Sequence, residues 1–315
     1  MSVSRIAIVG AGAAGLAAAA SLQAAGGDVV LFDKGRFPGG RLATRGSPWG
    51  GFDHGVQFLR LRDAGLRDEA ARWRRAGCLA GWPQQAAEVP AWIGTPSMRA
   101  LAAAWARPFE LHGGQAVQAI DGTPFSWSLR FAGGGVAGPF SRVLITVPAP
   151  QARPWFAGSA IAPVLAAIRY APCWTMMWVP AAGRLPPEIV FGAAADGLDW
   201  IAREDGKPGR DGAPRYLVHA DADWSTAHLD EDGPDVAVAL RQRAATRLGI
   251  DATAVHAVAH RWRHARVTEA AQQPVLSSGD GRYYAGDGCL GGRVEAALLS
   301  GRAAAQRILE DGDDR

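Results

Sequence analysis

The sequence contains little lysine and little cysteine. Its 315 residues include two lysines, Lys34 and Lys207, so almost all of its positive charge is carried by arginine. Its three cysteines, Cys78, Cys173 and Cys289, are far apart in the chain and form no Cys-x-x-Cys pair. This odd number and wide spacing argue against a disulfide framework and a zinc knuckle, and they favour a reducing cytoplasm.

An excess of one charge and long apolar runs are also missing. The formal net charge is +3 at pH 7 and the arginines are scattered, so nucleic acid is not expected as a partner. No uninterrupted, uncharged apolar run reaches about 18 residues, so no membrane-spanning helix is expected. Apolar residues make up 48% of the chain and charged residues 20%, which is typical of a packed globular protein.

Glycine, in contrast, is abundant and patterned near the N-terminus. The stretch "RIAIVGAG" predicts a buried parallel strand entering a tight turn, "AAGLAAAASLQAAG" predicts a helix, and "DVVLFDK" predicts a second strand ending in Asp33. Gly10, Gly12 and Gly15 then occupy the G-x-G-x-x-G positions of a dinucleotide-binding βαβ unit, and Asp33 is placed to bind a ribose. Because glycines interrupt this apolar start, we do not interpret it as a signal peptide.

Two further glycine-rich turns follow. "FPGGRLATR" places Gly39, Gly40 and Arg41 just past the second strand, and "YYAGDGCLGGRVEAALL" leads into a long final helix that is expected to start near Arg293. A helix N-terminus pointed at a flavin would stabilise the negative charge that reduction places on the ring. Asp287 could accept a hydrogen bond from a ribityl hydroxyl. We expect all three turns to converge on one ligand.

The rest of the chain mixes helices and short strands. We expect helices over residues 63–77, 94–106 and 233–249, strands in "FELHG", "AVQAID", "SWSLRFA" and "RVLITVPAP", and a mobile loop over residues 204–214. This pattern predicts an α/β fold, in which a Rossmann-type domain is interleaved with an α+β domain. The expected domains are a dinucleotide-binding domain of residues 1–62, 94–150 and 271–315, and a substrate domain of residues 63–93 and 151–270.

These pieces together resemble the flavin-containing amine oxidoreductase superfamily. The shared features are "VGAGAAGLAAA", "DKGRFPGGRLATR", "VLITVPAPQ" and "YYAGD" before a final helix. Within this superfamily, "GGRLATRGSPWGGFDHGVQFLRLRD" looks like the renalase-like branch, and "WIGTPSMRALA", "APCWTMMWV" and "HRWRHARV" look like segments of its bacterial members. The resemblance covers most of the chain but not residues 204–214. It implies a FAD-binding fold of the glutathione-reductase-2-like, amine oxidase type.

The resemblance implies non-covalent FAD as the cofactor. In this superfamily the Gly-Gly-Arg segment is a second contact on FAD, which places Arg41 near the pyrophosphate. The segment around Cys289 does not match the cysteine segment of covalent amine oxidases. The residues expected to bind FAD are Gly10, Gly12, Ala13, Ala14, Gly15, Asp33, Lys34, Gly39, Gly40, Arg41, Leu42, His54, Gly55, Val117, Gly286, Asp287, Arg293 and Val294.

The renalase-like pattern implies oxidation of dihydro-NAD(P) isomers that carry the hydride at ring position 2 or 6. The hydride would pass to flavin N5, NAD(P)+ would be released, and O2 would reoxidise the flavin and give hydrogen peroxide. Such a donor is neutral and becomes aromatic when it loses hydride, so the reaction needs no general base. It needs a flat, mostly apolar slot that stacks the donor on the flavin.

Other functions remain open at this stage. In many amine oxidases of the superfamily, a lysine is hydrogen-bonded through a water molecule to flavin N5. Neither Lys34, beside the ribose acid, nor Lys207, in a loop, is a natural candidate for this lysine. The alternatives are a flavin amine oxidase or desaturase acting on a small metabolite, a flavin-binding module without turnover, and an NAD-dependent dehydrogenase, against which the second and third turns argue. In each case we expect a cytoplasmic monomer or homodimer.

The sequence suggests substrate-side residues without identifying an indispensable catalytic one. The candidates in "FDHGVQF" could lie near the flavin edge or hold the local turn together. The tryptophans could line a pocket or pack in a core. The arginine lies among apolar residues, where an arginine usually has an anionic partner. The candidates are His54, Gln57, Trp174, Trp178, Trp262 and Arg263.

Histidines recur every four residues at His256, His260 and His264. On a helix this spacing would resemble a metal-binding stripe. The stretch "AVHAVAHRW" alternates like a strand, however, and has no nearby carboxylate or cysteine. We therefore expect no metal site.

Overall fold

The computed structural model describes residues 5–82, 88–181, 186, 190–191 and 196–313. Its contacts divide the chain into two compact units. Unit 1 comprises residues 1–40, 102–169 and 267–315, and unit 2 comprises residues 41–101 and 170–266. Each unit is therefore assembled from segments that are far apart in the sequence.

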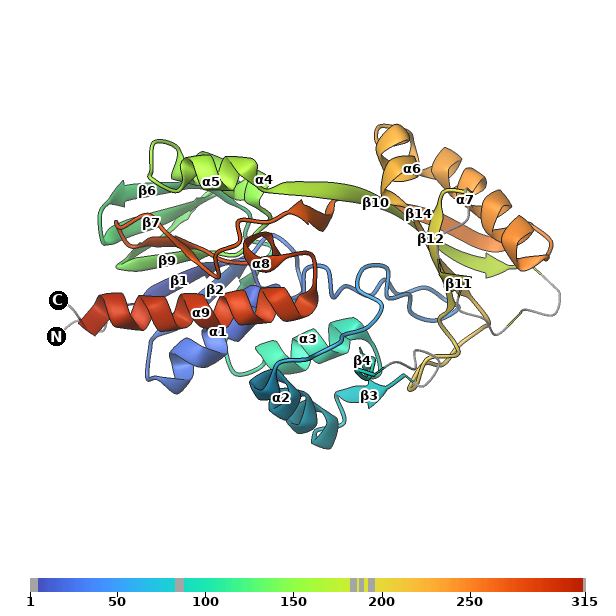
Figure 1. The fold of residues 1–315 in the computed structure, drawn as a ribbon, viewed down its shortest axis with the longest axis horizontal. Helices are drawn as coiled ribbons and strands as arrows, with labels where there is room; N and C mark the ends of the chain where they lie inside the picture. The colour runs from blue at the N-terminus through green and yellow to red at the C-terminus, as the bar shows by residue number, and fades with distance from the viewer. Residues whose placement is uncertain (1–4, 83–87, 182–185, 187–189, 192–195, 314–315) are drawn as a thin grey trace. The chain divides into compact units, whose positions relative to one another are not determined.

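Unit 1 is built on a six-stranded sheet with the strand order β15-β16-β9-β1-β2-β5, of which β9, β1 and β2 are labelled in Figure 1. Every pair in this order is parallel except β15 and β16. All four side chains of the central strand β1 are buried, as expected for a parallel strand covered on both faces. The strands are β1 (Ile6–Val9), β2 (Val29–Asp33), β5 (Glu110–Gly113), β9 (Arg142–Ile145), β15 (Leu276–Ser277) and β16 (Arg282–Tyr284).

Helices α1 (Ala13–Ala24) and α9 (Val294–Asp313) lie side by side in unit 1 (Figure 1). A side chain on Gly301 of α9 would bring its Cβ to 2.2 Å from the carbonyl oxygen of Ala14. The two helices therefore depend on small residues for their close approach. Other elements of unit 1 are the antiparallel strands β6 (Val117–Thr123), β7 (Ser126–Phe131) and β8 (Val136–Phe140), and the short helices α4 (Ala149–Ala152), η2 (Arg153–Phe156), α5 (Ala162–Ala167) and α8 (Asp287–Leu290).

Unit 2 contains a five-stranded sheet with the order β11-β12-β13-β10-β14. Alternate residues of β10 point to opposite faces, so Trp174, Met176 and Trp178 pack in a core with α7, whereas Met177 packs with Phe52. The sheet is thus covered on both faces at β10 and β13. Its elements are β10 (Arg169–Pro180), β11 (Val190–Phe191), β12 (Leu198–Arg203), β13 (Tyr216–Ala220), β14 (Ala254–Glu269), α6 (Ala222–Ala227) and α7 (Gly233–Leu248).

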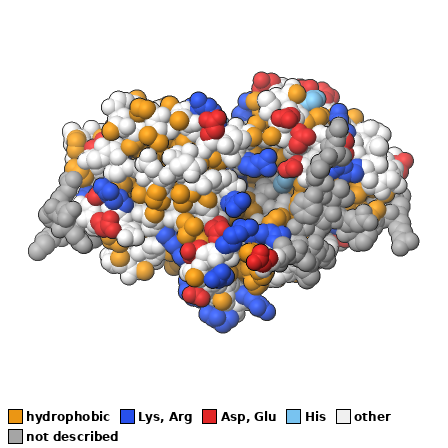
Figure 2. All heavy atoms as spheres, viewed as in Figure 1, with side chains coloured by type: hydrophobic (Ala, Val, Ile, Leu, Met, Phe, Trp, Pro, Cys, Tyr) orange, Lys and Arg blue, Asp and Glu red, His pale blue; other side chains and the backbone are white. Residues whose placement is uncertain are grey.

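The remaining elements of unit 2 include a basic helix, α2 (Ala64–Arg75). Asp63 caps it by accepting a hydrogen bond from the amide of Leu66 at 3.0 Å. Arginines occupy its last turn, where the helix dipole favours positive charge, and Figure 2 shows basic side chains on this part of the surface. Unit 2 also holds β3 (Leu79–Gly81) and β4 (Trp92–Gly94), and α3 (Met98–Ala106) begins in it and ends in unit 1.

The helices expected over residues 63–77, 94–106 and 233–249 are confirmed as α2, α3 and α7. The second of these, α3, begins only at Met98, because β4 occupies residues 92–94. The roles assigned to the two predicted domains, dinucleotide binding and substrate binding, stay predictions. The contact-based units differ from them by placing residues 41–62 and 94–101 in unit 2, and residues 151–169 and 267–270 in unit 1.

Across the described ranges, no helix is both long enough and apolar enough to cross a bilayer.

Candidate functional site

Two glycine-rich turns of unit 1 lie against each other beyond the carboxyl ends of β1 and β2. The amide of Gly39 donates to the carbonyl oxygen of Ala11 at 2.8 Å, and Gly12 and Gly39 form an isolated parallel bridge. A Cβ placed on Gly40 would lie 3.6 Å from the Cα of Gly12. The turns at residues 10–15 and 39–40 thus form one backbone surface, although the sequence separates them by a strand and a helix.

Thr146 links the third turn to the first one. It follows β9, and its hydroxyl donates to the carbonyl oxygen of Gly10 at 2.9 Å. On its other side lies Gly286, where an added Cβ would be 3.9 Å from the Thr146 carbonyl oxygen. Since β2, β1, β9 and β16 are parallel neighbours in that order, the carboxyl ends of β1, β2 and β16 bring all three turns to the same edge of the sheet. Thr146 was missed in the sequence, although it lies in the "VLITVPAP" motif.

The first turn leaves open space at the start of α1. Gly12 caps this helix at a φ of −80°, makes no side-chain cap, and is followed by no acidic residue in the first turn. No protein atom lies within 4 Å of a Cβ built on Gly12. Neither the backbone conformation nor the protein neighbours therefore require glycine here. A phosphate group held against the free first-turn amides would require it, because the ligand must approach the backbone.

Gly10 and Gly15 have different reasons for being glycine. Gly10 has a φ of +110°, and a Cβ there would lie 2.6 Å from the Thr146 hydroxyl. At Gly15 a Cβ would come to 2.0 Å from the Gly10 carbonyl oxygen. These two glycines allow the turn and the helix–strand contact, whereas Gly12 leaves room for a ligand.

Asp33 lies at the end of β2 beside these turns. Its carboxylate accepts hydrogen bonds from the amides of Ala11 at 2.7 Å and Gly35 at 2.6 Å. Burial raises its pKa, and the two amides act in the opposite direction. A carboxylate has about four acceptor positions, so Asp33 can also accept hydrogen bonds from ribose hydroxyls. Lys34, next to it, is exposed and donates to Gln151 at 3.2 Å.

The third turn is fixed to the final helix by Ser300. The Ser300 hydroxyl accepts from the amide of Gly286 at 2.9 Å and donates to the carbonyl oxygen of Pro274 at 2.6 Å. Cys289, in α8, is buried, and burial raises the pKa of its thiol to about 12. At neutral pH this thiol is therefore protonated and a poor nucleophile.

The other FAD-binding candidates of unit 1 lie around these turns or on neighbouring elements. Asp287 is buried at the start of α8, and Val294 opens α9 directly after the exposed Arg293. Ala13 and Ala14 begin α1. The half-buried Val117 opens β6. Their contacts with FAD stay predictions.

Four FAD-binding candidates belong to unit 2. The Arg41 guanidinium donates to the carbonyl oxygen of Ala265 at 2.9 Å, and Leu42 is buried. A Cβ on Gly55 would lie 2.1 Å from the Arg41 carbonyl oxygen, so glycine is needed there for a close backbone contact. With His54, these residues form a local structure of unit 2, and their contacts with FAD also stay predictions.

His54 belongs to an aromatic cluster with His260 and Trp262. The His54 ring lies 5.2 Å from the Trp262 ring and 4.9 Å from the His260 ring, between centroids. The Trp262 indole also donates to the His54 carbonyl oxygen at 2.9 Å. Burial is the main cause that lowers the pKa of His54 to about 4, and it also lowers the pKa of His260. At neutral pH the cluster is therefore an uncharged aromatic surface, in which His54 is buried and His260 and Trp262 are half-buried.

Trp174, Trp178 and Arg263 lie away from this cluster. Trp174 and Trp178 are buried in the core beneath α7, on the other face of the sheet from Met177. Arg263 is exposed and donates to Asp230 at 3.0 Å. Its anionic partner is thus a surface carboxylate. Of the substrate-side candidates, the structure brings together His54, Gln57 and Trp262 only.

The three recurring histidines lie on β14, as their alternation predicted. His256 stacks on Trp49 with ring centroids 5.0 Å apart. Within the described part of the chain, no group of three or more His, Cys, Asp and Glu side chains is arranged to hold a metal ion.

The expectation of a mobile loop over residues 204–214 was wrong, because the loop contains buried charges. The side chains of Glu204 and Lys207 are both 0% exposed and form an ion pair. Lys207 also donates to the Gln57 amide oxygen at 3.1 Å and lies 3.9 Å from an Asp53 carboxylate oxygen. Buried charges require partners of this kind. The opposite charges in "EDGKPGR" were the available signal of this ion pair.

Asp53 is the centre of this ion cluster, which we define as Asp53, Glu204, Lys207 and Arg210. Arg210 pairs with the Asp53 carboxylate, which also accepts from the Thr44 hydroxyl at 2.5 Å and from the amide of Met98, at the start of α3, at 3.1 Å. Burial acts to raise the pKa of Asp53, but the neighbouring cations outweigh it and lower the pKa. Burial raises the pKa of Glu204. The cluster thus ties three distant segments of unit 2 together.

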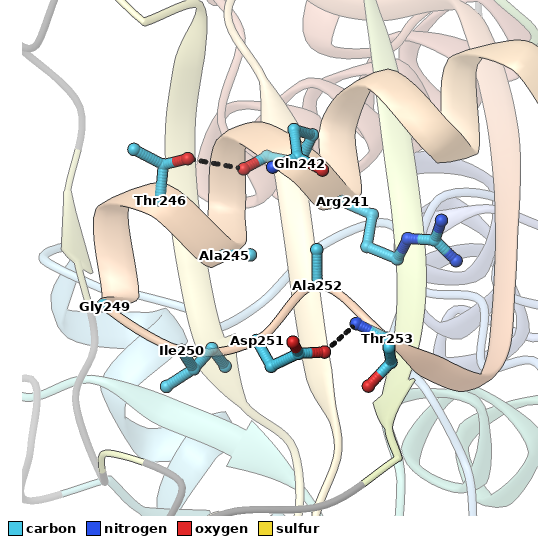
Figure 3. Close-up of a pocket in the computed structure, with 9 residues that line it drawn as sticks. All are labelled: Arg241, Gln242, Ala245, Thr246, Gly249, Ile250, Asp251, Ala252 and Thr253. Carbon is cyan, nitrogen blue, oxygen red and sulfur yellow. Dashed lines mark hydrogen bonds between the residues drawn. The ribbon is translucent and has the colours of Figure 1, made fainter.

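A separate hollow lies at the end of α7 (Figure 3). The helix stops at Gly249, which has a φ of +65°, and the Asp251 carboxylate then accepts from the Thr253 amide at 2.6 Å. None of the predicted site residues lines it. The hollow is lined by Arg241, Gln242, Ala245, Thr246, Gly249, Ile250, Asp251, Ala252 and Thr253.

Comparison with known proteins agrees with this architecture. Residues 8–68 match the family of NAD(P)-binding Rossmann-like domains. A protein from Exiguobacterium sp. 255-15, provisionally described as a protoporphyrinogen oxidase, is similar over 98% of this chain and 100% of its own, with a TM-score of 0.78 and 13% identity.

Putrescine oxidase has a similar structure. A variant redesigned for cofactor binding matches over 98% of this chain and 99% of its own, with a TM-score of 0.74 and 12% identity. The wild-type enzyme bound to putrescine matches over 97% and 99%, with a TM-score of 0.67 and 13% identity. The chain therefore has the fold of the FAD-dependent amine oxidases, and the predicted fold class is confirmed. The renalase-like branch is not distinguished by these likenesses and stays a prediction.

Proposed function

We propose that the protein is an FAD-dependent oxidoreductase that oxidises a small molecule. The observation that carries this proposal is the convergence of three glycine-rich turns at the carboxyl edge of the parallel sheet in unit 1. Ligands of open α/β sheets bind at this edge. The likeness to amine oxidases, which extends over almost the whole chain, supports the same conclusion.

The residues of unit 1 fit FAD, which is a dinucleotide. The open space at Gly12 and the free amides of the first turn of α1 would accept the pyrophosphate. Asp33 would accept hydrogen bonds from the adenosine ribose, and Asp287 from a ribityl hydroxyl. The protonated thiol of Cys289 supports a non-covalent cofactor. When bound, FAD would accept a hydride from the substrate and pass the electrons to O2 with formation of hydrogen peroxide.

We propose the 2- and 6-dihydro isomers of NAD(P)H as the substrates, with NAD(P)+ as the product. Such donors need no base, and neither lysine of this chain is placed to serve as one. Lys34 is exposed and bonded to Gln151, and Lys207 is held in the ion cluster. The uncharged surface of His54, His260 and Trp262 has the chemistry needed to stack a neutral dihydropyridine ring.

Amine oxidation is a second candidate, and the likeness to putrescine oxidase in its putrescine complex favours it. In that case the substrate would carry a positive charge at neutral pH. The aromatic cluster of unit 2 would then contribute a π surface for a cation and only weak bases, because burial lowers the pKa of both its histidines. This difference in substrate charge makes the two candidates easy to separate.

One preparation tests both candidates. The purified protein is expected to be yellow and to release FAD on heating. It is then mixed without oxygen with the 2- or 6-dihydro isomers of NAD, with ordinary 4-dihydro-NADH, and with amines. Rapid bleaching by the isomers alone supports the proposed substrate, whereas bleaching by an amine alone would replace it. A colourless protein that cannot be reconstituted with FAD would overturn the proposed cofactor.

A further inference from the structure

The Gln57 side chain is bonded at both ends of its amide group. Its nitrogen donates to the carbonyl oxygens of Asp53 and Gly55, the second at 3.3 Å. Its oxygen accepts from the Lys207 ammonium at 3.1 Å. The Gln57 residue is 6% exposed, so water does not compete freely for these bonds. The side chain thus bridges the turn over residues 53–57, which carries His54.

Lys207 is itself fixed in position. Its ammonium forms the buried ion pair with Glu204 and lies 5.3 Å from the centre of the Trp82 ring. An ammonium has three donors, and Glu204 and Gln57 take two of them. Because the lysine side chain is fully buried and anchored, it can hold the Gln57 amide in one orientation.

The turn held by Gln57 is also the one that builds the aromatic cluster. The His54 carbonyl oxygen accepts from the Trp262 indole at 2.9 Å, and the His54 ring packs on the Trp262 ring. Gly55 is in close contact with the Arg41 backbone, and the amide of Val56 donates to the Arg41 carbonyl oxygen at 2.9 Å. A small rotation of this turn would therefore move His54 relative to Trp262.

We propose that Lys207 is a positioning residue, whose ammonium fixes the Gln57 amide and through it the turn that places His54 against Trp262 and His260. This inference rests on the proposed function in one respect, namely that the substrate ring binds at the aromatic cluster. The contact itself does not depend on FAD. Both parts can therefore be tested separately.

The first test follows the Gln57 amide by NMR in protein labelled with 15N-glutamine. The variant is Lys207→Met/Glu204→Gln, because removing the lysine alone would leave a buried carboxylate without its partner. The glutamine keeps an acceptor for the Asp53 amide, which donates to Glu204 at 2.9 Å. We expect the Gln57 amide protons to exchange about tenfold faster or more than in the unmodified protein, since a buried hydrogen bond is lost.

Lys34→Met is the matched control, since it removes the exposed Lys34–Gln151 bond and should leave Gln57 exchange unchanged. Unchanged Gln57 exchange in the double variant would overturn the proposal. If the double variant does not fold, Gln57→Leu removes the same contact and leaves all charges of the ion cluster paired. The His54 ring resonances should then shift or broaden, and unchanged resonances would count against the proposal.

The second test measures the reduction of bound flavin by a dihydro-NAD isomer without oxygen. Gln57→Ala and the double variant should each lower the rate about tenfold, because both misplace the same turn. Their combination should lower it no further, since the two act through one contact. An additive loss of about a hundredfold would show that Lys207 does not act through Gln57. If no donor reduces the unmodified protein, the proposed function fails, while the exchange experiment still decides the role of Lys207.

Discussion

At the scale of single residues, the three glycines of the first turn differ in the reason why glycine is needed at each position. Gly10 needs its lack of a side chain for a positive φ and for contact with Thr146, and Gly15 needs it for contact with the Gly10 carbonyl oxygen. Gly12 has an ordinary φ and open space around it. The protein alone therefore explains the first two glycines, and the third is explained only by the proposed ligand.

Gly12→Ala is predicted to leave the apoprotein stable and to weaken FAD retention. The added methyl group meets no protein atom, but it enters the space proposed for the pyrophosphate. We expect the free energy of unfolding of the apoprotein, measured by thermal denaturation, to change by less than about 1 kcal/mol. The remaining effect is the change in chain entropy when glycine becomes alanine. Bound flavin, measured by absorbance after dialysis, should fall about tenfold or more, as expected for loss of a close phosphate contact.

Gly10→Ala is the control for this prediction. It should destabilise the apoprotein by about 2–4 kcal/mol, from backbone strain and from overlap with Thr146. If Gly12→Ala proved equally destabilising without FAD, or retained normal flavin, the proposed role of Gly12 would be rejected.

Arg41→Ala tests the residue that the resemblance places near the pyrophosphate. Loss of a cation that contacts the phosphates should lower the flavin content of the purified protein. The same change removes the hydrogen bond to Ala265, so the free energy of unfolding is measured alongside. Normal flavin content in the folded variant would restrict Arg41 to its backbone contact in unit 2.

At the scale of elements, the parallel sheet brings distant turns together. Strands β1, β2, β9 and β16 run in the same direction, so the turns that follow them meet at one edge. In unit 2 the ion cluster has a comparable role. Asp53 lies in the 52–57 segment, caps the start of α3, and receives Arg210 from the loop after β12.

Asp53→Asn should loosen these three segments together. It removes the negative charge that both Lys207 and Arg210 face, and it leaves cations buried with less compensation. We expect a loss of about 3–5 kcal/mol in the free energy of unfolding, measured by urea denaturation. The exposed carboxylate Asp121, which pairs with Arg130, provides the comparison, and Asp121→Asn should cost less than about 1 kcal/mol. Similar losses in both variants would argue against a structural role for the cluster.

At the scale of the whole molecule, two histidines predict how stability depends on pH, namely the buried His54 and the half-buried His219 on β13. Burial is the main cause that lowers the pKa of His54 to about 4 and that of His219 to about 3, from an ordinary value of 6.5. Below pH 6.5 the unfolded chain binds protons on these histidines that the folded protein does not bind. The contribution of these groups is therefore complete above pH 6.5 and decreases as the pH falls toward 4 and 3.

The size of this effect can be measured by urea denaturation at several pH values. From the pKa difference, His54 alone is expected to contribute a loss of about 3 kcal/mol by pH 4. His54→Phe should keep an aromatic ring in the cluster and should make stability fall less steeply between pH 6.5 and 4. An unchanged slope in this variant would mean that His54 titrates normally in the folded protein.

Local spacing was sufficient to predict the Rossmann-type start of the fold. One helix and one strand connect the turn of Gly10, Gly12 and Gly15 to Asp33. Their arrangement therefore follows from helix and strand geometry. The capped helix α2 and the alternation on β14 could be predicted for the same reason. Each of these features depends on neighbours within one or two elements.

The buried ion cluster could not be predicted in this way. Lys207 and Gln57 are 150 positions apart, and nothing in either local sequence indicates the other. Charged residues in a loop are usually solvent-exposed, so the partner decides whether burial is possible. The core positions of Trp174 and Trp178, and the surface position of Arg263, were likewise decided by the face of the sheet on which each side chain lies.

The sequence by itself thus determined the parallel βαβ unit, its glycine turn and the acid that follows it, because short-range backbone geometry specifies them. Only the tertiary structure brought the second and third turns to the same edge, through the order of the parallel strands. It alone also decided which charges are buried in unit 2, because the desolvation of a charge is offset only by partners that folding brings from elsewhere in the chain.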